Sequence, residues 1–175
     1  MIGFRHADPR YPFLWEGPEQ PAARWHAAGD GPVHYFCDTP DGAWAEFLRH
    51  EEITDPEDLA TIRHALWAVD LGHQQHAKPD LPQEVLTGGY ASYAACRTEA
   101  SRQRGLGADG LEAPSAALLP GAARGWRVDG GLQPGAPRDG VVYVLFGRRP
   151  DLIGWRATAA GQPDQALLAA VRPLE

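Results

Sequence analysis

The chain has 175 residues, of which 43% are hydrophobic and six are tryptophan, a composition that suits a folded core and excludes a disordered protein. Its formal net charge of −7 argues against general affinity for nucleic acid or for an anionic membrane surface. Two cysteines, Cys37 and Cys96, provide neither a disulfide framework nor a zinc site, and the N-terminal segment has no hydrophobic signal region. We therefore expect a soluble cytoplasmic protein.

The first half of the chain predicts short strands separated by turns and by helices with proline-containing caps. Residues 8–21 carry four prolines and should form an irregular loop, anchored on the core by Tyr11, Phe13, Leu14 and Trp15. Thr39 followed by Pro40 is typical of a helix start, and this helix should run to about residue 50. The predicted strands are residues 1–4, 33–37 and 65–71, and a second, short helix should start at Asp55-Pro56.

The second half of the chain predicts one longer helix followed by strands and a loop rich in glycine and proline. The helix should span residues 89–103 and end at Gly105. The expected extended segments are residues 110–115, 141–146 and 152–158, with mostly loop over residues 117–140 and a short C-terminal helix over residues 164–171. Because strands and helices do not alternate strictly, the pattern indicates a single α+β domain over residues 1–175.

Three patterns that could suggest function have simpler explanations. Residues 105–110 (GLGADG) match the text of a dinucleotide fingerprint, but a helix precedes them and a strand follows, which is the reverse of the order that such a loop needs. His73 and His76 lie in a polar loop and indicate surface histidines, so we expect no metal site. Arg97, Arg102 and Arg104 most simply form a solvated helix face.

Arg24, Tyr35 and Glu46 follow one another at intervals of eleven positions. Arg24 precedes Trp25, and taken alone it could be a surface arginine stacked on that ring. Glu46 lies off the apolar stripe of its helix, so the core does not need it and it is free to face water or a cleft. We expect the three side chains to meet in one cleft.

Several sequence segments, taken in order, resemble the RES domain family. They are FRHADPRYP (residues 4–12), ARWHAAGDGPVHYFCDTPDGAWAEF (23–47), GYASYAACRTEASRQRGLGADGL (89–111), APSA (113–116) and VVYVLF (141–146). The resemblance covers nearly the whole chain. Three positions depart from the usual family pattern: His6 stands where tyrosine is frequent, His26 where asparagine is usual, and no arginine soon follows Ser115.

The resemblance implies a fold, an activity and a partner. RES domains have a fold similar to ADP-ribosyltransferase toxins of the diphtheria type, with a mixed sheet and flanking helices. They are toxins that consume NAD⁺ as glycohydrolases or phosphorylases, beside an Xre-type antitoxin with a helix-turn-helix segment. NAD⁺ would thus be a substrate, with no cofactor and no metal. Two alternatives remain open: transfer of ADP-ribose to a cellular protein, and a non-catalytic module that binds a partner.

The resemblance also assigns roles to residues. Arg24, Tyr35 and Glu46 would be catalytic, and NAD⁺ would be bound by Arg5, His6, Arg24, Trp25, Tyr35 and Ser115. An arginine suits the pyrophosphate, a tyrosine ring can stack on nicotinamide, and a carboxylate can stabilise the positive charge that develops on the ribose. Ser115 lies in no nucleophile elbow, so we expect it to be a hydrogen-bond partner for ribose or phosphate.

Overall fold

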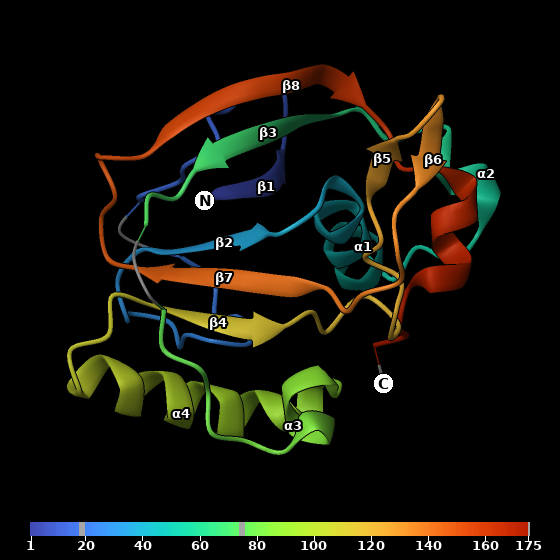
Figure 1. The fold of residues 1–175 in the computed structure, drawn as a ribbon. Coiled ribbons are helices and arrows are strands. Elements are labelled where there is room, and N and C mark those ends of the chain that lie inside the picture. Colours follow the sequence, from blue (N-terminus) through green and yellow to red (C-terminus); the bar gives the residue numbers. More distant parts are fainter. Residues whose placement is uncertain (18–19, 74–75, 175) are drawn as a thin grey trace.

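The computed structural model describes residues 1–17, 20–73 and 76–174. Its centre is a six-stranded sheet of order β4-β7-β2-β1-β3-β8, in which every neighbouring pair is antiparallel (Figure 1). The strands are β1 (Ile2–Ala7), β2 (Val33–Cys37), β3 (His64–Asp70), β4 (Gly110–Pro114), β7 (Val141–Phe146) and β8 (Ile153–Gly161). A second, two-stranded sheet pairs β5 (Trp126–Val128) with β6 (Leu132–Pro134). The α+β class is confirmed.

The large sheet opens between β1 and β2. β1 pairs with β3 along its whole length, from Ile2 opposite Asp70 to Ala7 opposite Ala65. Its register with β2 is a single pair, Phe4 opposite Cys37. Figure 1 shows β8, β3 and β1 turning away from β2, β7 and β4, with helix α1 (Pro40–His50) at the open side. The two halves of the sheet therefore diverge beyond Phe4.

The helices cover the sheet in two groups. The α-helices are α1 (Pro40–His50), α2 (Pro56–Leu59), α3 (Gln83–Thr87) and α4 (Tyr93–Gly105), and the 3₁₀ helices are η1 (Tyr90–Ser92) and η2 (Gln165–Ala170). α3 and α4 lie along the edge strand β4, whereas α1, α2 and η2 gather on the right-hand side of the sheet in Figure 1. The predicted start of α1 is confirmed, because the Thr39 side chain accepts a hydrogen bond of 3.0 Å from the Gly42 N–H. α1 buries Leu48 completely, which fixes its orientation on the sheet.

Some elements differ from the predicted ones. The first strand continues to Ala7, and the β5–β6 hairpin lies inside the stretch predicted as loop. Gly105 is the last residue of α4, whereas Gly107, with φ of 88°, takes the left-handed conformation that ends the helix. The glycine-rich segment does lie between α4 and β4, so the rejection of a dinucleotide loop is confirmed.

The proline-rich segment before residue 18 is anchored by only part of its aromatic and apolar set. Phe13 and Leu14 pack on a buried cluster on one face of the sheet. Tyr11 and Trp15 are instead 49% and 52% exposed, so the prediction that they anchor the loop is wrong. Their exposure leaves two aromatic faces on the surface next to β1.

The arginines of α4 do more than cover a solvated face. The Arg97 Nε donates to the Ala23 carbonyl at 2.8 Å. Arg104 lies over the Phe146 ring and is 3.4 Å from the Asp30 carboxylate. The predicted solvated face is therefore wrong for these two residues, which tie the segment around Arg24 to the helix. Both cysteines are buried and free.

Candidate active site

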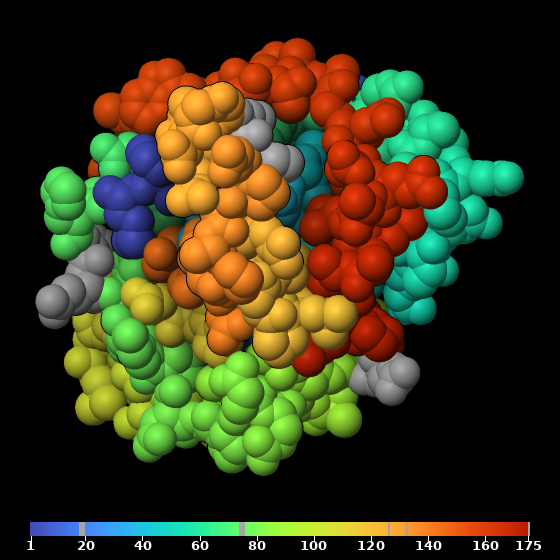
Figure 2. Space-filling view, turned by 45° about the vertical axis from the view of Figure 1, so that its right-hand side comes forward, coloured from blue at the N-terminus to red at the C-terminus, as the bar shows by residue number. Residues whose placement is uncertain are grey.

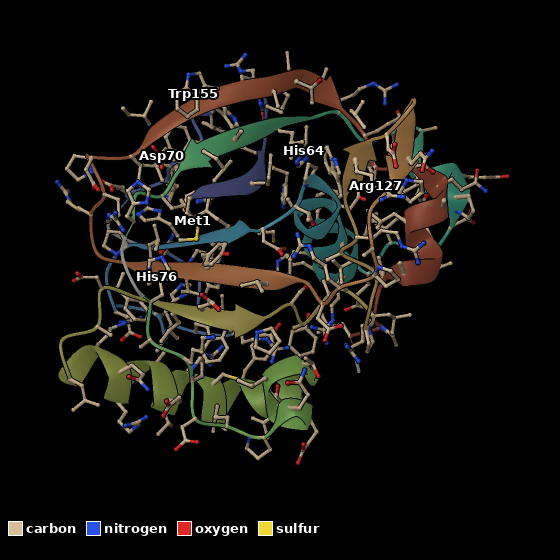
Figure 3. All side chains as sticks on the ribbon, viewed as in Figure 1. Met1, His64, Asp70, His76, Arg127 and Trp155 are labelled. Carbon is tan, nitrogen blue, oxygen red and sulfur yellow. The ribbon has the colours of Figure 1, made fainter. Side chains whose placement is uncertain are left out.

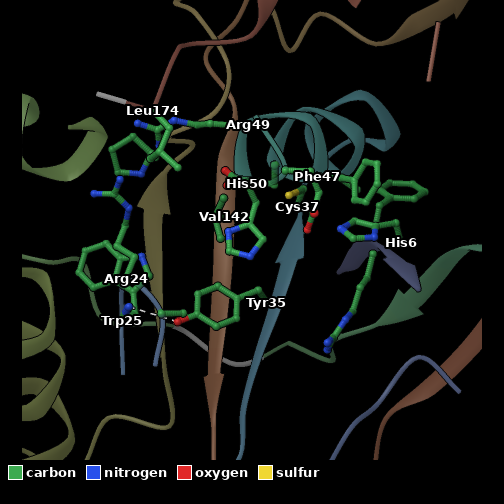
Figure 4. Close-up of a pocket in the computed structure, with 18 of the residues that line it drawn as sticks. His6, Arg24, Trp25, Tyr35, Cys37, Phe47, Arg49, His50, Val142 and Leu174 are labelled. Carbon is green, nitrogen blue, oxygen red and sulfur yellow. Dashed lines mark hydrogen bonds between the residues drawn. The ribbon is translucent and has the colours of Figure 1, made fainter. Parts of the chain in front are cut away.

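A cleft of about 410 Å³ lies where β1 and β2 diverge, a volume typical of small-molecule sites. Its walls come from both strands, from α1, from the segment around Arg24 and from the residues after β4 (Figure 4). Seen in Figure 2, teal atoms of α1 are visible between the segment that carries β5 and β6 and the red C-terminal residues. The lining includes these predicted site residues: Arg5, His6, Arg24, Trp25, Tyr35 and Glu46. The remaining predicted site residue, Ser115, donates a hydrogen bond to Glu46.

Glu46 projects from α1 into this cleft, and Ser115 orients it. The Ser115 hydroxyl oxygen accepts from the N–H groups of Ala117 and Leu118, both at 3.2 Å. This leaves its proton to be donated to Glu46 Oε1 at 3.1 Å. Burial raises the pKa of Glu46, while Arg49 and the Ser115 hydrogen bond oppose that rise. Ser115 thus holds the carboxylate in place instead of pointing at the space that a ligand would take.

Arg24 lines the cleft, but its guanidinium is occupied by the protein. Nη1 donates to Ser92 Oγ at 2.9 Å and to the Val85 carbonyl at 3.3 Å, and Nη2 donates to the Gly88 carbonyl. Arg49 Nη2 donates to the same Gly88 carbonyl at 2.8 Å. Two guanidinium groups therefore meet at one carbonyl oxygen, and both place positive charge near Glu46. Arg24 is therefore better suited to supply a fixed positive charge near Glu46 than to bind a phosphate group directly.

Tyr35 forms a rigid aromatic wall. The His26 Nε2 lies 2.8 Å from the Pro21 carbonyl, which can only accept, so Nε2 carries the proton. His26 Nδ1 then accepts from the Tyr35 hydroxyl at 2.9 Å. The same hydroxyl accepts from the Trp25 N–H at 3.1 Å. Burial raises the pKa of Tyr35 above its ordinary value, so the phenol stays neutral and its ring is fixed.

Arg5 and His6 occupy the β1 side of the opening. The Arg5 guanidinium lies over the Phe36 ring, and its buried Nη1 has no hydrogen-bond partner among the described residues. Burial lowers the pKa of Arg5 to about 10, which still leaves it charged at neutral pH. His6 Nδ1 is 3.2 Å from His64 Nδ1, and burial lowers the pKa of His6 to about 3. A cationic donor without a partner thus stands beside the neutral imidazole of His6.

Comparison with known proteins identifies the family. The model of the RES domain family matches residues 3–165. The chain belongs to the RES domain family. Among solved structures, the RES domain is similar to the MbcT toxin in the crystal structure of the M. tuberculosis MbcT–MbcA toxin–antitoxin complex, with a TM-score of 0.60 and 15% identity over 96% of this chain and 86% of that chain. No curated protein shows a significant match to it.

The RES domain site also contains residues that the sequence did not single out. Arg49 lies one helical turn after Glu46, so the spacing of α1 could have indicated it. Tyr93 packs under the Arg24 guanidinium at 4.6 Å from its ring centroid. His64 faces His6 because β3 pairs with β1, a neighbour relation that no local pattern reveals. Among the described residues, no group of three or more His, Cys, Asp or Glu side chains could hold a metal ion, and no helix is long and apolar enough to cross a membrane.

Proposed function

We propose that this RES domain is the toxin of a toxin–antitoxin pair and cleaves the bond between nicotinamide and ribose in NAD⁺. The observation that carries the proposal is the placement of Glu46. Its carboxylate is oriented by Ser115 in a recessed cleft, with Arg24 and Arg49 nearby and the Tyr35 ring in the wall. A recessed, oriented carboxylate suits the stabilisation of a developing positive charge.

The charges that line the cleft support binding of a dinucleotide, because its pyrophosphate is anionic. Three arginines line it, against two glutamates, in a protein whose net charge is −7. Arg24 and Arg49 both donate to the Gly88 carbonyl, whereas no described residue accepts a hydrogen bond from the Arg5 guanidinium, so we assign the attraction of the pyrophosphate to the charge of Arg5. Tyr35 offers a fixed ring on which the nicotinamide can stack, and a neutral aromatic face tolerates the positive charge of that ring.

Glu46 then acts on the ribose. When the glycosidic bond breaks, its electron pair passes to the nicotinamide nitrogen, which becomes neutral, and positive charge develops on the ribose. The Glu46 carboxylate stabilises this charge and accepts a hydrogen bond from the ribose 2′-hydroxyl. Water or phosphate then adds to the ribose carbon, and when water adds, the proton that it loses passes to the solvent. Arg49 and Arg24 favour the ionised form of Glu46, because their charges oppose the rise of its pKa caused by burial.

Fold and comparison support the proposal. A sheet that opens beside a carboxylate-bearing helix is what an ADP-ribosyltransferase-like fold would place around NAD⁺. The structural neighbour MbcT comes from a toxin–antitoxin complex. We infer that this chain also has a cognate antitoxin, of the Xre type with a helix-turn-helix segment, and that DNA binding belongs to that partner.

Product analysis tests the proposal. The purified protein is incubated with NAD⁺ with and without phosphate, and nicotinamide and the ADP-ribose products are quantified. Release of nicotinamide with free ADP-ribose indicates hydrolysis, and a product that forms only with phosphate indicates phosphorolysis. Covalent label on a protein from ³²P-NAD⁺ would instead indicate transfer. Absence of nicotinamide release under every condition would refute the proposal.

A further inference from the structure

The main chain directly after Ser115 is held by a residue near the C-terminus. Residues 116–118 are buried and follow β4 as an irregular segment. Arg172 Nε donates to the Ala116 carbonyl and Nη2 donates to the Leu118 carbonyl, both at 3.2 Å. The Arg172 N–H donates to the carbonyl between them, that of Ala117, at 2.6 Å. A single residue thus satisfies all three carbonyls of this segment, and buried carbonyls need such partners.

The N–H groups of the same segment organise Glu46. Those of Ala117 and Leu118 donate to Ser115 Oγ, which leaves the hydroxyl proton to Glu46 Oε1. A shift of the segment would misalign these two donors, and a hydroxyl group without them is free to rotate away from Glu46. The segment therefore connects Arg172, through its carbonyls, with the carboxylate in the cleft, through its N–H groups.

An arginine suits this position better than a lysine would. The Nε and Nη2 N–H groups lie on one edge of a planar guanidinium, so they bind two carbonyls at once in a fixed geometry, whereas an ammonium group is a single point charge. Arg172 is not among the described residues that line the cleft, and none of its hydrogen bonds with described residues goes to Glu46. Its influence on Glu46 therefore passes through residues 116–118.

The C-terminal segment also reaches the helix that carries Glu46. The Pro173 carbonyl accepts a hydrogen bond from Arg49 Nε at 3.3 Å. Leu174 lines the cleft beside Arg49 (Figure 4). Residues 172–174 thus contact both α1 and the segment after β4, the two parts of the chain that place Glu46 and Ser115.

We propose that Arg172 is a positioning residue, which holds residues 116–118 so that Ser115 orients the Glu46 carboxylate. The proposal rests on the proposed function, because that function gives the oriented carboxylate its role on the ribose. Loss of Arg172 should lower kcat and leave KM nearly unchanged, since no contact with the substrate is lost. It should also weaken the hydrogen bond that favours the ionised form of Glu46, and so raise the pKa of this carboxyl further.

The ionisation of Glu46 tests this role without any turnover. The glutamate carboxyl carbons are labelled with ¹³C, the Glu46 resonance is identified by its absence in Glu46→Gln, and its pKa is read from an NMR titration. Arg172→Ala should raise the pKa of Glu46, as Ser115→Ala should. Arg172→Lys keeps the charge but loses the two-pronged contact, so it should raise this pKa too, and it covers the case in which Arg172→Ala does not fold.

Arg63→Ala is the matched control, because the Arg63 guanidinium also donates to two main-chain carbonyls, those of Ala60 and Ile62. Arg63 directly precedes β3, whose first residue, His64, is labelled in Figure 3, and β3 lies in the half of the sheet away from β4. The Arg63 and Arg172 variants leave unchanged the charged and titratable groups that face Glu46, which are Arg24, Arg49, Cys37 and Tyr93. Arg63→Ala should therefore change neither the pKa of Glu46 nor kcat.

Nicotinamide release supplies the second readout. Arg172→Ala should lower kcat about tenfold, as Ser115→Ala should, and the double variant should lose clearly less than the roughly hundredfold of two independent effects, because both changes break the same link. A wild-type pKa of Glu46 in either Arg172 variant would overturn the positioning role, as would a fully multiplicative loss of kcat in the double variant.

The outcomes separate this proposal from the proposed function. If the wild-type protein cleaves NAD⁺ and the Arg172 variants leave the pKa of Glu46 unchanged, the positioning role fails while the proposed function stands. If the Arg172 variants raise this pKa but the wild-type protein releases no nicotinamide from NAD⁺, the proposed function fails and the positioning role stands.

Discussion

Replacing Glu46 with glutamine removes one negative charge from the cleft and almost nothing else. Glutamine has the same shape, and its carbonyl oxygen can still accept the hydrogen bond from Ser115. Arg24 and Arg49 both donate to the carbonyl of Gly88, so their positions do not depend on the carboxylate. The substitution therefore isolates the charge of Glu46 from the architecture of the site.

The expected magnitudes for activity and stability differ sharply. Loss of one preorganised electrostatic contact to the transition state costs roughly 10²–10³-fold in kcat. Burial raises the pKa of Glu46, which means that the folded protein bears a cost for keeping it ionised, and a neutral side chain removes that cost. We therefore expect the free energy of unfolding to change by about 1 kcal/mol or less.

The assay compares nicotinamide release by wild type, Glu46→Gln and Glu51→Gln, with thermal unfolding of each. Glu51 is the matched control, because it also lines the cleft but is exposed at the end of α1. We expect Glu51→Gln to keep nearly full activity. The reasoning would be refuted if Glu46→Gln retained more than a tenth of the wild-type kcat, or if both variants lost activity equally.

Three further predictions follow from the same contacts. Ser115→Ala should lower kcat about tenfold with little change in KM. It should also move the acid limb of the pH–rate profile to higher pH, because the hydrogen bond that is lost favours the ionised form of Glu46. An unchanged pH–rate profile would contradict this. Tyr35→Phe should lower the free energy of unfolding by about 1–3 kcal/mol, measured by urea denaturation, because two buried partners lose the hydroxyl. Burial lowers the pKa of His6 to about 3 and that of His34 to about 4. Below about pH 6.5 these two imidazoles therefore bind protons in the unfolded chain but stay neutral in the folded protein. The free energy of unfolding should therefore fall as the pH drops below that value, by up to about 1.4 kcal/mol per pH unit for each histidine, and His6→Phe should flatten the slope; equal slopes would count against this assignment.

Local patterns predicted most of the elements because these elements depend on residues that are neighbours in sequence. Thr39 and Pro40 fix the start of α1 through a cap and a preset backbone angle. The β-branched and aromatic residues of 33–37 and 141–146 mark two central strands. The β5–β6 hairpin was missed because its strands are three residues long and lie among glycines and prolines.

The candidate site was predicted only in part, because its details depend on pairing between distant segments. The resemblance to RES domains indicated which residues would gather, and these residues line the cleft except Ser115, which donates a hydrogen bond to Glu46. It did not indicate that Arg24 donates to the segment that carries Val85 and Gly88, since this follows from how α3 and α4 pack. Nor did it reveal the unpartnered donor of Arg5, which depends on β1 leaving β2 after a single register pair.

The most direct measurement of the central claim is the number of nicotinamide molecules released from NAD⁺ per protein molecule over time. We predict many turnovers for the wild-type protein, whether the acceptor is water or phosphate, and nearly none for Glu46→Gln at equal stability. Less than one nicotinamide per wild-type molecule, with or without phosphate, would contradict the claim that this cleft cleaves NAD⁺.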